Sequence, residues 1–201
     1  MSDPGFSSRN LRRFVEAAAA ELGTDQLNAM LALAEQPVEW TNPAGLQKLD
    51  EIEAARAYAS LQAAMRTYYG RGARGVLLRV GQRLWHLLLD DAALTHKAQA
   101  AVIRRLPQNS RRKPALELLS RFLGAQPGDI TLHSQDLDLL LADHASPTTR
   151  GIQYPLPICF VTQGLIRENL LWATGQRHDV EETSCRARGD HDCEFKITME
   201  T

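Results

Sequence analysis

The residues with the clearest chemical potential in this sequence are cysteines and carboxylates near the C-terminus. All three cysteines of the 201-residue chain, Cys159, Cys185 and Cys193, fall there. Two carboxylates, Glu181 and Glu182, stand just ahead of Cys185. Three sulfurs and one carboxylate, drawn from two distant places in the sequence, form a donor set that suits a closed four-coordinate zinc site. The sequence therefore predicts zinc, with either Glu181 or Glu182 as the fourth ligand.

A β-hairpin is expected to bring two of these cysteines together. A turn at Gly189 separates two runs with β character. The runs are residues 180–187 and 192–198. If the turn is centred on Gly189, Cys185 and Cys193 lie opposite each other with Cβ atoms about 4.5–5.5 Å apart. Glu182 then has the wrong strand parity to share their face, so its use as a ligand requires a bulge or bend in the backbone.

The remaining cysteine stands where a helix is expected to begin. Cys159 follows Pro155 and Pro157 and opens an apolar run spaced for one face of a helix. The positive end of a helix dipole favours a thiolate. Because the thiolate is the form that binds metal, this position suits a ligand.

Two other interpretations of the cysteines remain open. Cys185 and Cys193 could form a disulfide, and Cys159 could be a small core residue. Three cysteines leave one unpaired, and no secretory signal is recognised at the N-terminus, so a reducing cytoplasm is expected. Cysteine clusters there are more often metal sites than crosslinks. The sequence also has no apolar run of about eighteen residues, so no membrane span is expected.

The pattern around the cysteines resembles a known family. A cysteine, a helix containing Gly164, and V-E-E-T-x-C-x-A-x-G-D-x-x-C-E-F-x-I are similar to the C-terminal half of the 4-vinyl reductase domain. The resemblance implies the fold of TRAPP-type transport subunits and of haem-based nitric-oxide sensors. It also extends to the sensory domains of bacterial regulators that respond to aromatic compounds, in which three cysteines and a glutamate hold zinc. Carried onto this chain, the resemblance selects Cys159, Glu182, Cys185 and Cys193, with zinc in a structural role.

The resemblance covers about residues 50–198, although its specific motifs lie only in roughly the last forty of them. The glycine-rich residues 69–81 resemble the N-terminal half of the family. The polar pair that binds phenol in the aromatic sensors has no counterpart here, because Ser110 and Asp138 stand at the corresponding distances from Cys159. Phenol itself is therefore not the expected ligand.

The rest of the sequence predicts an α+β fold with an N-terminal helical extension. Apolar stripes at helical spacing predict helices at residues 7–36 (two helices), 43–69, 76–89, 92–104 and 114–123. Gly81 is expected to allow close packing of its helix. Strands are expected at residues 130–133 and 137–142, the second of them central in a sheet. Helices, then strands, one helix and a last hairpin indicate an antiparallel sheet covered by helices.

Two domains are predicted. Residues 1–42 form an N-terminal helical arm, and residues 43–201 form the ligand-binding domain. The arm is a short apolar helical hairpin that cannot bury its own stripe. It therefore packs either on a second copy, giving a homodimer, or on its own domain, and the homodimer is the preferred interpretation.

Charge and motifs narrow the function classes. The formal net charge of −1 and the pI near 6.6 give no electrostatic footprint for nucleic acid. Residues 70–75 satisfy G-x-G-x-x-G, but a helix precedes them where a dinucleotide site needs a strand. No arrangement of nucleophile and base is recognised, and zinc-bound cysteines are unavailable as nucleophiles. Catalysis therefore has little support in the sequence.

A binding module is the expected function. It would hold a small hydrophobic or aromatic ligand between sheet and helices, and a separate signalling partner would read its occupancy. The candidate lining residues, whose alternative role is as core aromatics, are Trp85, Phe122, Tyr154 and Trp172. The alternatives are an accessory or carrier protein of bacteriochlorophyll biosynthesis that handles a vinyl tetrapyrrole, as the family name implies, and an interaction scaffold like the TRAPP subunits.

Overall fold

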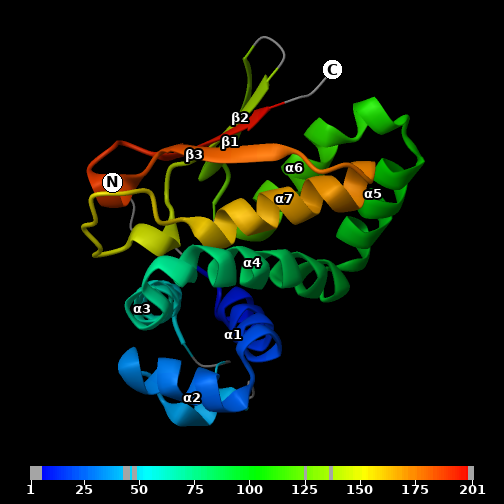
Figure 1. Ribbon diagram of the computed structural model, residues 1–201. Coiled ribbons are helices and arrows are strands. Elements are labelled where there is room, and N and C mark those ends of the chain that lie inside the picture. Colours follow the sequence, from blue (N-terminus) through cyan, green and yellow to red (C-terminus); the bar gives the residue numbers. More distant parts are fainter. Residues whose placement is uncertain (1–5, 43–45, 47–48, 125, 136–137, 199–201) are drawn as a thin grey trace.

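A single helix, α7 (Phe160–Thr174), lies at the centre of the fold. The computed structural model describes residues 6–42, 46, 49–124, 126–135 and 138–198. Figure 1 shows α7 between the β-sheet above it and α4 (Ala73–Asp90) below it, with α1 (Ser8–Leu22) and α2 (Thr24–Leu33) beneath α4. Because α7 is covered on two sides, it buries residues around most of its circumference, as expected for a helix inside a core.

The sheet is antiparallel, as predicted. Its strands are β1 (Ile130–Gln135), β2 (Asp138–Asp143), β3 (Asp179–Ser184) and β4 (Cys193–Thr198), in the order β1-β2-β4-β3. The central position predicted for the second strand is confirmed, although residue 137 lies outside the described residues. Alternate residues of β4, namely Cys193, Phe195 and Ile197, are buried, which makes one face of the sheet part of the core.

The two central helices touch backbone to backbone. A Cβ built on Gly81 of α4 would overlap the carbonyl oxygen of Val161, and a Cβ built on Gly164 of α7 would overlap that of Leu78. Only glycine at these two positions permits so close a crossing. The close-packing role predicted for Gly81 therefore has a direct structural basis.

One helix begins later than predicted. The sequence predicts a start at residue 43, but α3 (Glu51–Tyr69) begins eight residues on, after a capping box. The Asp50 carboxylate accepts a hydrogen bond from the Glu53 backbone N–H at 2.7 Å, and the Glu53 carboxylate accepts one from the Asp50 N–H at 3.2 Å. This reciprocal pair satisfies backbone donors that an uncapped first turn would leave open. Residues 43–45 and 47–48 lie outside the described residues.

We expect Asp50→Ala to lower the free energy of unfolding by about 1 kcal/mol, because it removes the acceptor of the cap. Chemical denaturation of both proteins measures the difference. Asp50→Asn is the matched control, since asparagine caps about as well as aspartate. An equal loss in both variants would show that the charge matters and the cap does not.

The N-terminal helices belong to the same core as the remainder of the chain. Phe14 of α1 packs edge-on against Tyr58 of α3, with ring centroids 4.7 Å apart. Glu21 of α1 pairs with Arg79 and Arg83 of α4 at 2.5 and 2.9 Å. The predicted boundary between residues 42 and 43 and the predicted homodimer stay predictions, although α1 already has a partner within its own chain.

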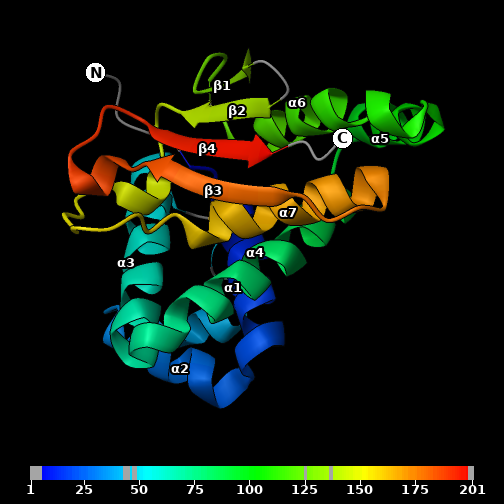
Figure 2. The same ribbon diagram turned by 45° about the horizontal axis from the view of Figure 1, so that its top comes forward.

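The other predicted helices also form. They are α5 (Leu94–Arg105) and α6 (Arg112–Leu123), and both lie beside the C-terminal part of α7 in Figures 1 and 2. None of the described helices combines the length and the apolarity that crossing a membrane requires.

Candidate metal centre

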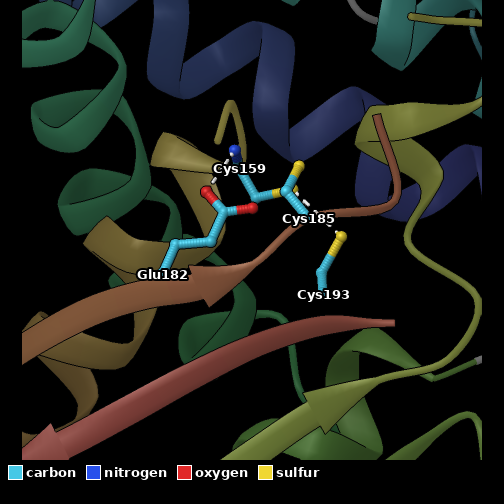
Figure 3. A group of neighbouring side chains, drawn as sticks. All are labelled: Cys159, Glu182, Cys185 and Cys193. Carbon is cyan, nitrogen blue, oxygen red and sulfur yellow. Dashed lines mark hydrogen bonds between the residues drawn. The ribbon is translucent and has the colours of Figure 1, made fainter. Parts of the chain in front are cut away.

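Three elements bring the predicted metal ligands together. Cys159 is the N-cap residue of α7, Glu182 lies on β3, Cys185 follows β3, and Cys193 begins β4. Figure 3 shows the four side chains converging between the helix start and the hairpin. One ligand atom from each lies within 4.8 Å of every other. The cysteines are completely buried, and Glu182 is 8% exposed.

Hydrogen bonds hold this cluster in place. The backbone N–H of Cys159 donates to the Glu182 carboxylate at 2.8 Å, which joins the start of α7 to β3 (Figure 3). The backbone N–H of Arg186 donates to the sulfur of Cys193 at 3.4 Å. The second carboxylate oxygen of Glu182, Oε1, is buried and has no hydrogen-bond partner in the described part of the chain. A buried acceptor without a partner is costly unless something absent from the protein chain satisfies it.

A bulge resolves the parity problem of Glu182. In the hairpin Glu182 pairs with Phe195, whereas Ser184 pairs with Glu194, so the register shifts by one residue between them. Glu182 reaches the buried face by regular alternation with Val180, and the extra residue after it brings Cys185 onto that same face. Glu181 faces outward and is exposed. The structure therefore brings Glu182, and not Glu181, to the cysteines.

A tight turn positions the two hairpin cysteines. Residues Arg186–Arg188 form one 3₁₀ turn, and Gly189 follows with a φ of 100°, in the left-handed region that favours glycine. The Asp190 carboxylate closes the turn by accepting a hydrogen bond from the Cys185 N–H at 2.8 Å. The predicted turn at Gly189 is therefore present.

Burial makes a fully ionised cluster unfavourable without a cation. Burial raises the pKa of the Cys159 thiol well above its ordinary value and raises the pKa of Glu182 to about 8. A hydrogen bond from the Cys159 thiol lowers the pKa of Cys185, which concentrates negative charge on that sulfur. A bound divalent cation reverses this balance, because it stabilises thiolate and carboxylate together.

The donor set fits zinc better than it fits a disulfide. All three cysteines are free, and the sulfurs of Cys159 and Cys193 are 3.5 Å apart. Two thiolates bound tetrahedrally to one zinc lie about 3.8 Å apart, given zinc–sulfur bonds of about 2.3 Å. The disulfide alternative concerned Cys185 and Cys193, and both of these cysteines are free.

The C-terminal part of the chain is similar in sequence to a known domain family. Residues 144–199 match the 4-vinyl reductase domain. The predicted resemblance to this family is confirmed for the matched segment, which contains all four cluster residues. No curated protein sequence matches the chain.

Two solved structures are similar in fold to much more of the chain than the matched segment. An H-NOX protein from S. oneidensis in the Fe(II)NO ligation state is 15% identical, with a TM-score of 0.58 over 98% of this chain and 100% of that one. Trafficking protein particle complex subunit 3 from Naegleria fowleri, covalently bound to palmitic acid, is 18% identical, with a TM-score of 0.52 over 73% of this chain and 93% of that one. These two likenesses establish the fold.

A third solved structure is the phenol-responsive sensory domain of the transcription activator PoxR with phenol. It is 15% identical, with a TM-score of 0.48 over 70% of this chain and 73% of that one.

The predicted aromatic residues do not form one pocket. Trp85, Phe122 and Trp172 gather at the end of α7 that is farther from the cysteines, with Trp85 5.8 Å from Phe122 and 5.3 Å from Trp172 between ring centroids. Trp85 is fully buried, as the core interpretation expects. Tyr154 lies apart, beside the hairpin turn, where its backbone N–H donates to the Ala187 carbonyl.

Two residues that contact the cysteines of the site were not identifiable from the sequence. The hydroxyl of Ser146 lies 3.6 Å from the sulfur of Cys159, and Asp190 fixes the backbone of Cys185. The Gly189-Asp190 pair signals a turn but not this bond. Ser146 carries no sequence signal, because only the fold brings its loop to α7.

Proposed function

We propose that Cys159, Glu182, Cys185 and Cys193 bind one zinc ion. The observation that carries this proposal is the complete burial of three free sulfurs around a carboxylate whose Oε1 has no hydrogen-bond partner among the residues that the structure describes. Four protein ligands close the coordination sphere of zinc and leave no position for water. The ion would act as a crosslink between the start of α7 and the β3–β4 hairpin. A reducing compartment such as the cytoplasm would keep the thiols available.

We expect Glu182→Gln to weaken zinc affinity by about tenfold or more, because a neutral amide is a poorer ligand than a carboxylate in a thiolate site. Glu181→Gln is the matched control, since that neighbouring side chain is exposed. Competition with a chromophoric zinc chelator measures both affinities. The reverse order of the two effects would move the ligand to Glu181.

We further infer that the chain is a small-molecule binding module of the sensory kind. The match to the 4-vinyl reductase domain supports this proposal. So does the fold, because one protein that shares it is described in an Fe(II)NO ligation state and another is covalently bound to palmitic acid. The expected ligand is small and hydrophobic or aromatic, and zinc would hold the scaffold around it rather than react with it.

The protein as purified offers the first test. Elemental analysis beside native and denaturing mass spectrometry should find one zinc per chain and a small organic compound that leaves on denaturation. Native mass also reports whether the chain is a homodimer. Visible pigment absorbance would instead favour the tetrapyrrole carrier. Zinc-free protein that takes up no added zinc would contradict the metal proposal.

A further inference from the structure

A pocket that includes none of the four cluster residues lies among the helices. It has a volume of about 300 Å³, opens to solvent, and is bordered by the start of α1, the start of α3, the end of α4, α5 and the end of α6. Figure 2 shows α5 and α6 at the C-terminal end of α7, whereas the metal centre is at its N-terminal end. The volume falls at the lower limit of known small-molecule pockets.

The lining of this cavity combines apolar and cationic groups. Leu88 and Phe122 contribute apolar surface. Arg9, His96 and Arg121 contribute nitrogen donors from three different helices. A small guest could therefore bury an apolar body and still meet charged donors.

These donors are only partly used within the protein. Arg9 donates from Nε to Asp91 at 2.6 Å, and Arg121 donates from Nη1 to Gln99 at 3.1 Å. The other nitrogens of both guanidinium groups, and the ring nitrogens of His96, have no hydrogen-bond partner among the described residues.

Acidic groups near the cavity do not cancel this positive charge. The Asp91 carboxylate forms ion pairs with both Arg9 and Arg13, and its Oδ1 lies 2.9 Å from Nη2 of Arg13. Glu51 is the acidic residue of the lining. Arg9 is thus paired with Asp91, whereas Arg121 has no acidic partner among the described residues, so the charge of Arg121 is available to an anionic guest.

We propose that this cavity binds a small aromatic carboxylate, with its ring against Leu88 and Phe122 and its carboxylate toward Arg9 and Arg121. Guanidinium groups bind carboxylates with paired, charge-assisted hydrogen bonds, which a neutral aromatic cannot form. The inference rests on the proposed function and adds the place and the charge of the ligand. It also replaces the lining predicted from sequence, of which only Phe122 contributes to this cavity.

Two tryptophans near this pocket allow ligand binding to be followed by fluorescence. Phe122 packs against Trp85, with ring centroids 5.8 Å apart, and Trp85 packs against Trp172 at 5.3 Å. The chain's other tryptophan, Trp40, lies in a separate 3₁₀ segment, Val38–Thr41. A ligand against Phe122 is therefore expected to change the fluorescence of two tryptophans out of three.

The test uses the zinc-loaded full chain titrated with benzoate and naphthoate, and with the neutral analogues benzyl alcohol and naphthalenemethanol. Tryptophan fluorescence and calorimetry follow binding. The test variant is Arg9→Gln with Arg121→Gln. The control is Lys97→Gln, since Lys97 is exposed on α5 next to His96 but does not line the cavity.

We expect saturable binding of a carboxylate probe, weakened at least about tenfold in the arginine variant because each lost charged hydrogen bond has about that effect on affinity. The control should bind as the unmodified protein does. Carboxylate binding that is unchanged in the arginine variant, or equal to that of the neutral analogue, would overturn this inference and leave the proposed function standing. Failure of all four probes to bind would overturn this inference alone, because the zinc content and the copurifying compound test the proposed function separately.

Discussion

Replacing Cys185 or Cys193 by alanine is expected to abolish stoichiometric zinc binding and to lower the free energy of unfolding by several kcal/mol. A metal that binds only the folded state contributes its binding free energy to folding, and these ligands connect elements that are distant in sequence. Removing one sulfur also leaves the three remaining ligand side chains buried around an incomplete metal site. Elemental analysis and denaturant unfolding, each with and without zinc, measure the two effects.

A matched control separates loss of zinc from loss of packing. Ser184→Ala changes the residue beside Cys185 without touching the cluster, and it should leave both zinc content and stability unchanged. Zinc removal from the unmodified protein should bring its stability close to that of the cysteine variants. Variants that keep one zinc per chain, or that stay as stable as the zinc-loaded protein, would contradict the proposed centre.

The arrangement around the cluster was largely predictable because local signals agree. Gly189-Asp190 predicts the turn, and strand parity then requires an irregularity near Glu182, which the bulge between Glu182 and Ser184 supplies. The choice of Glu182 over Glu181 came from family resemblance and could not come from spacing alone. The buried Oε1 of Glu182 is visible only once the strand has been folded against α7.

The start of α3 shows where a local signal misled. Asn42-Pro43 looks like a helix start, because proline fits the first turn of a helix. Asp50 and Glu53 offer a complete capping box instead, and that reciprocal pair sets the observed start. A sequence pattern with two possible starts does not reveal which one the tertiary structure selects.

The cavity lay beyond sequence reasoning for a different reason. Its walls come from residues near 9, 51, 88–96 and 121–124, so only long-range packing defines it. The four predicted lining residues are all large aromatics, but size does not distinguish a core residue such as Trp85 from a lining residue such as Phe122. Tyr154 does not line this pocket, and its backbone N–H donates to the Ala187 carbonyl in the β3–β4 hairpin.

Replacing Gly81 by alanine is expected to lower the free energy of unfolding by about 3 kcal/mol, at the upper end for an overpacked core. The added Cβ would meet the carbonyl oxygen of Val161, which is backbone and cannot rotate away. The neighbouring glycine of the same helix, Gly75, is the control. An added Cβ there meets only the flexible Arg79 side chain, so Gly75→Ala should be neutral or stabilising by up to about 1 kcal/mol.

The double variant Gly81→Ala with Gly164→Ala gives a sharper test of the same contact. Both added methyl groups push α4 and α7 apart at one crossing, so a single separation relieves both clashes and the combined loss should fall short of the sum. Since α7 begins next to Cys159, that separation should also weaken zinc binding, whereas Gly75→Ala should not. Additive losses with unchanged zinc affinity would mean that the crossing and the metal centre are independent.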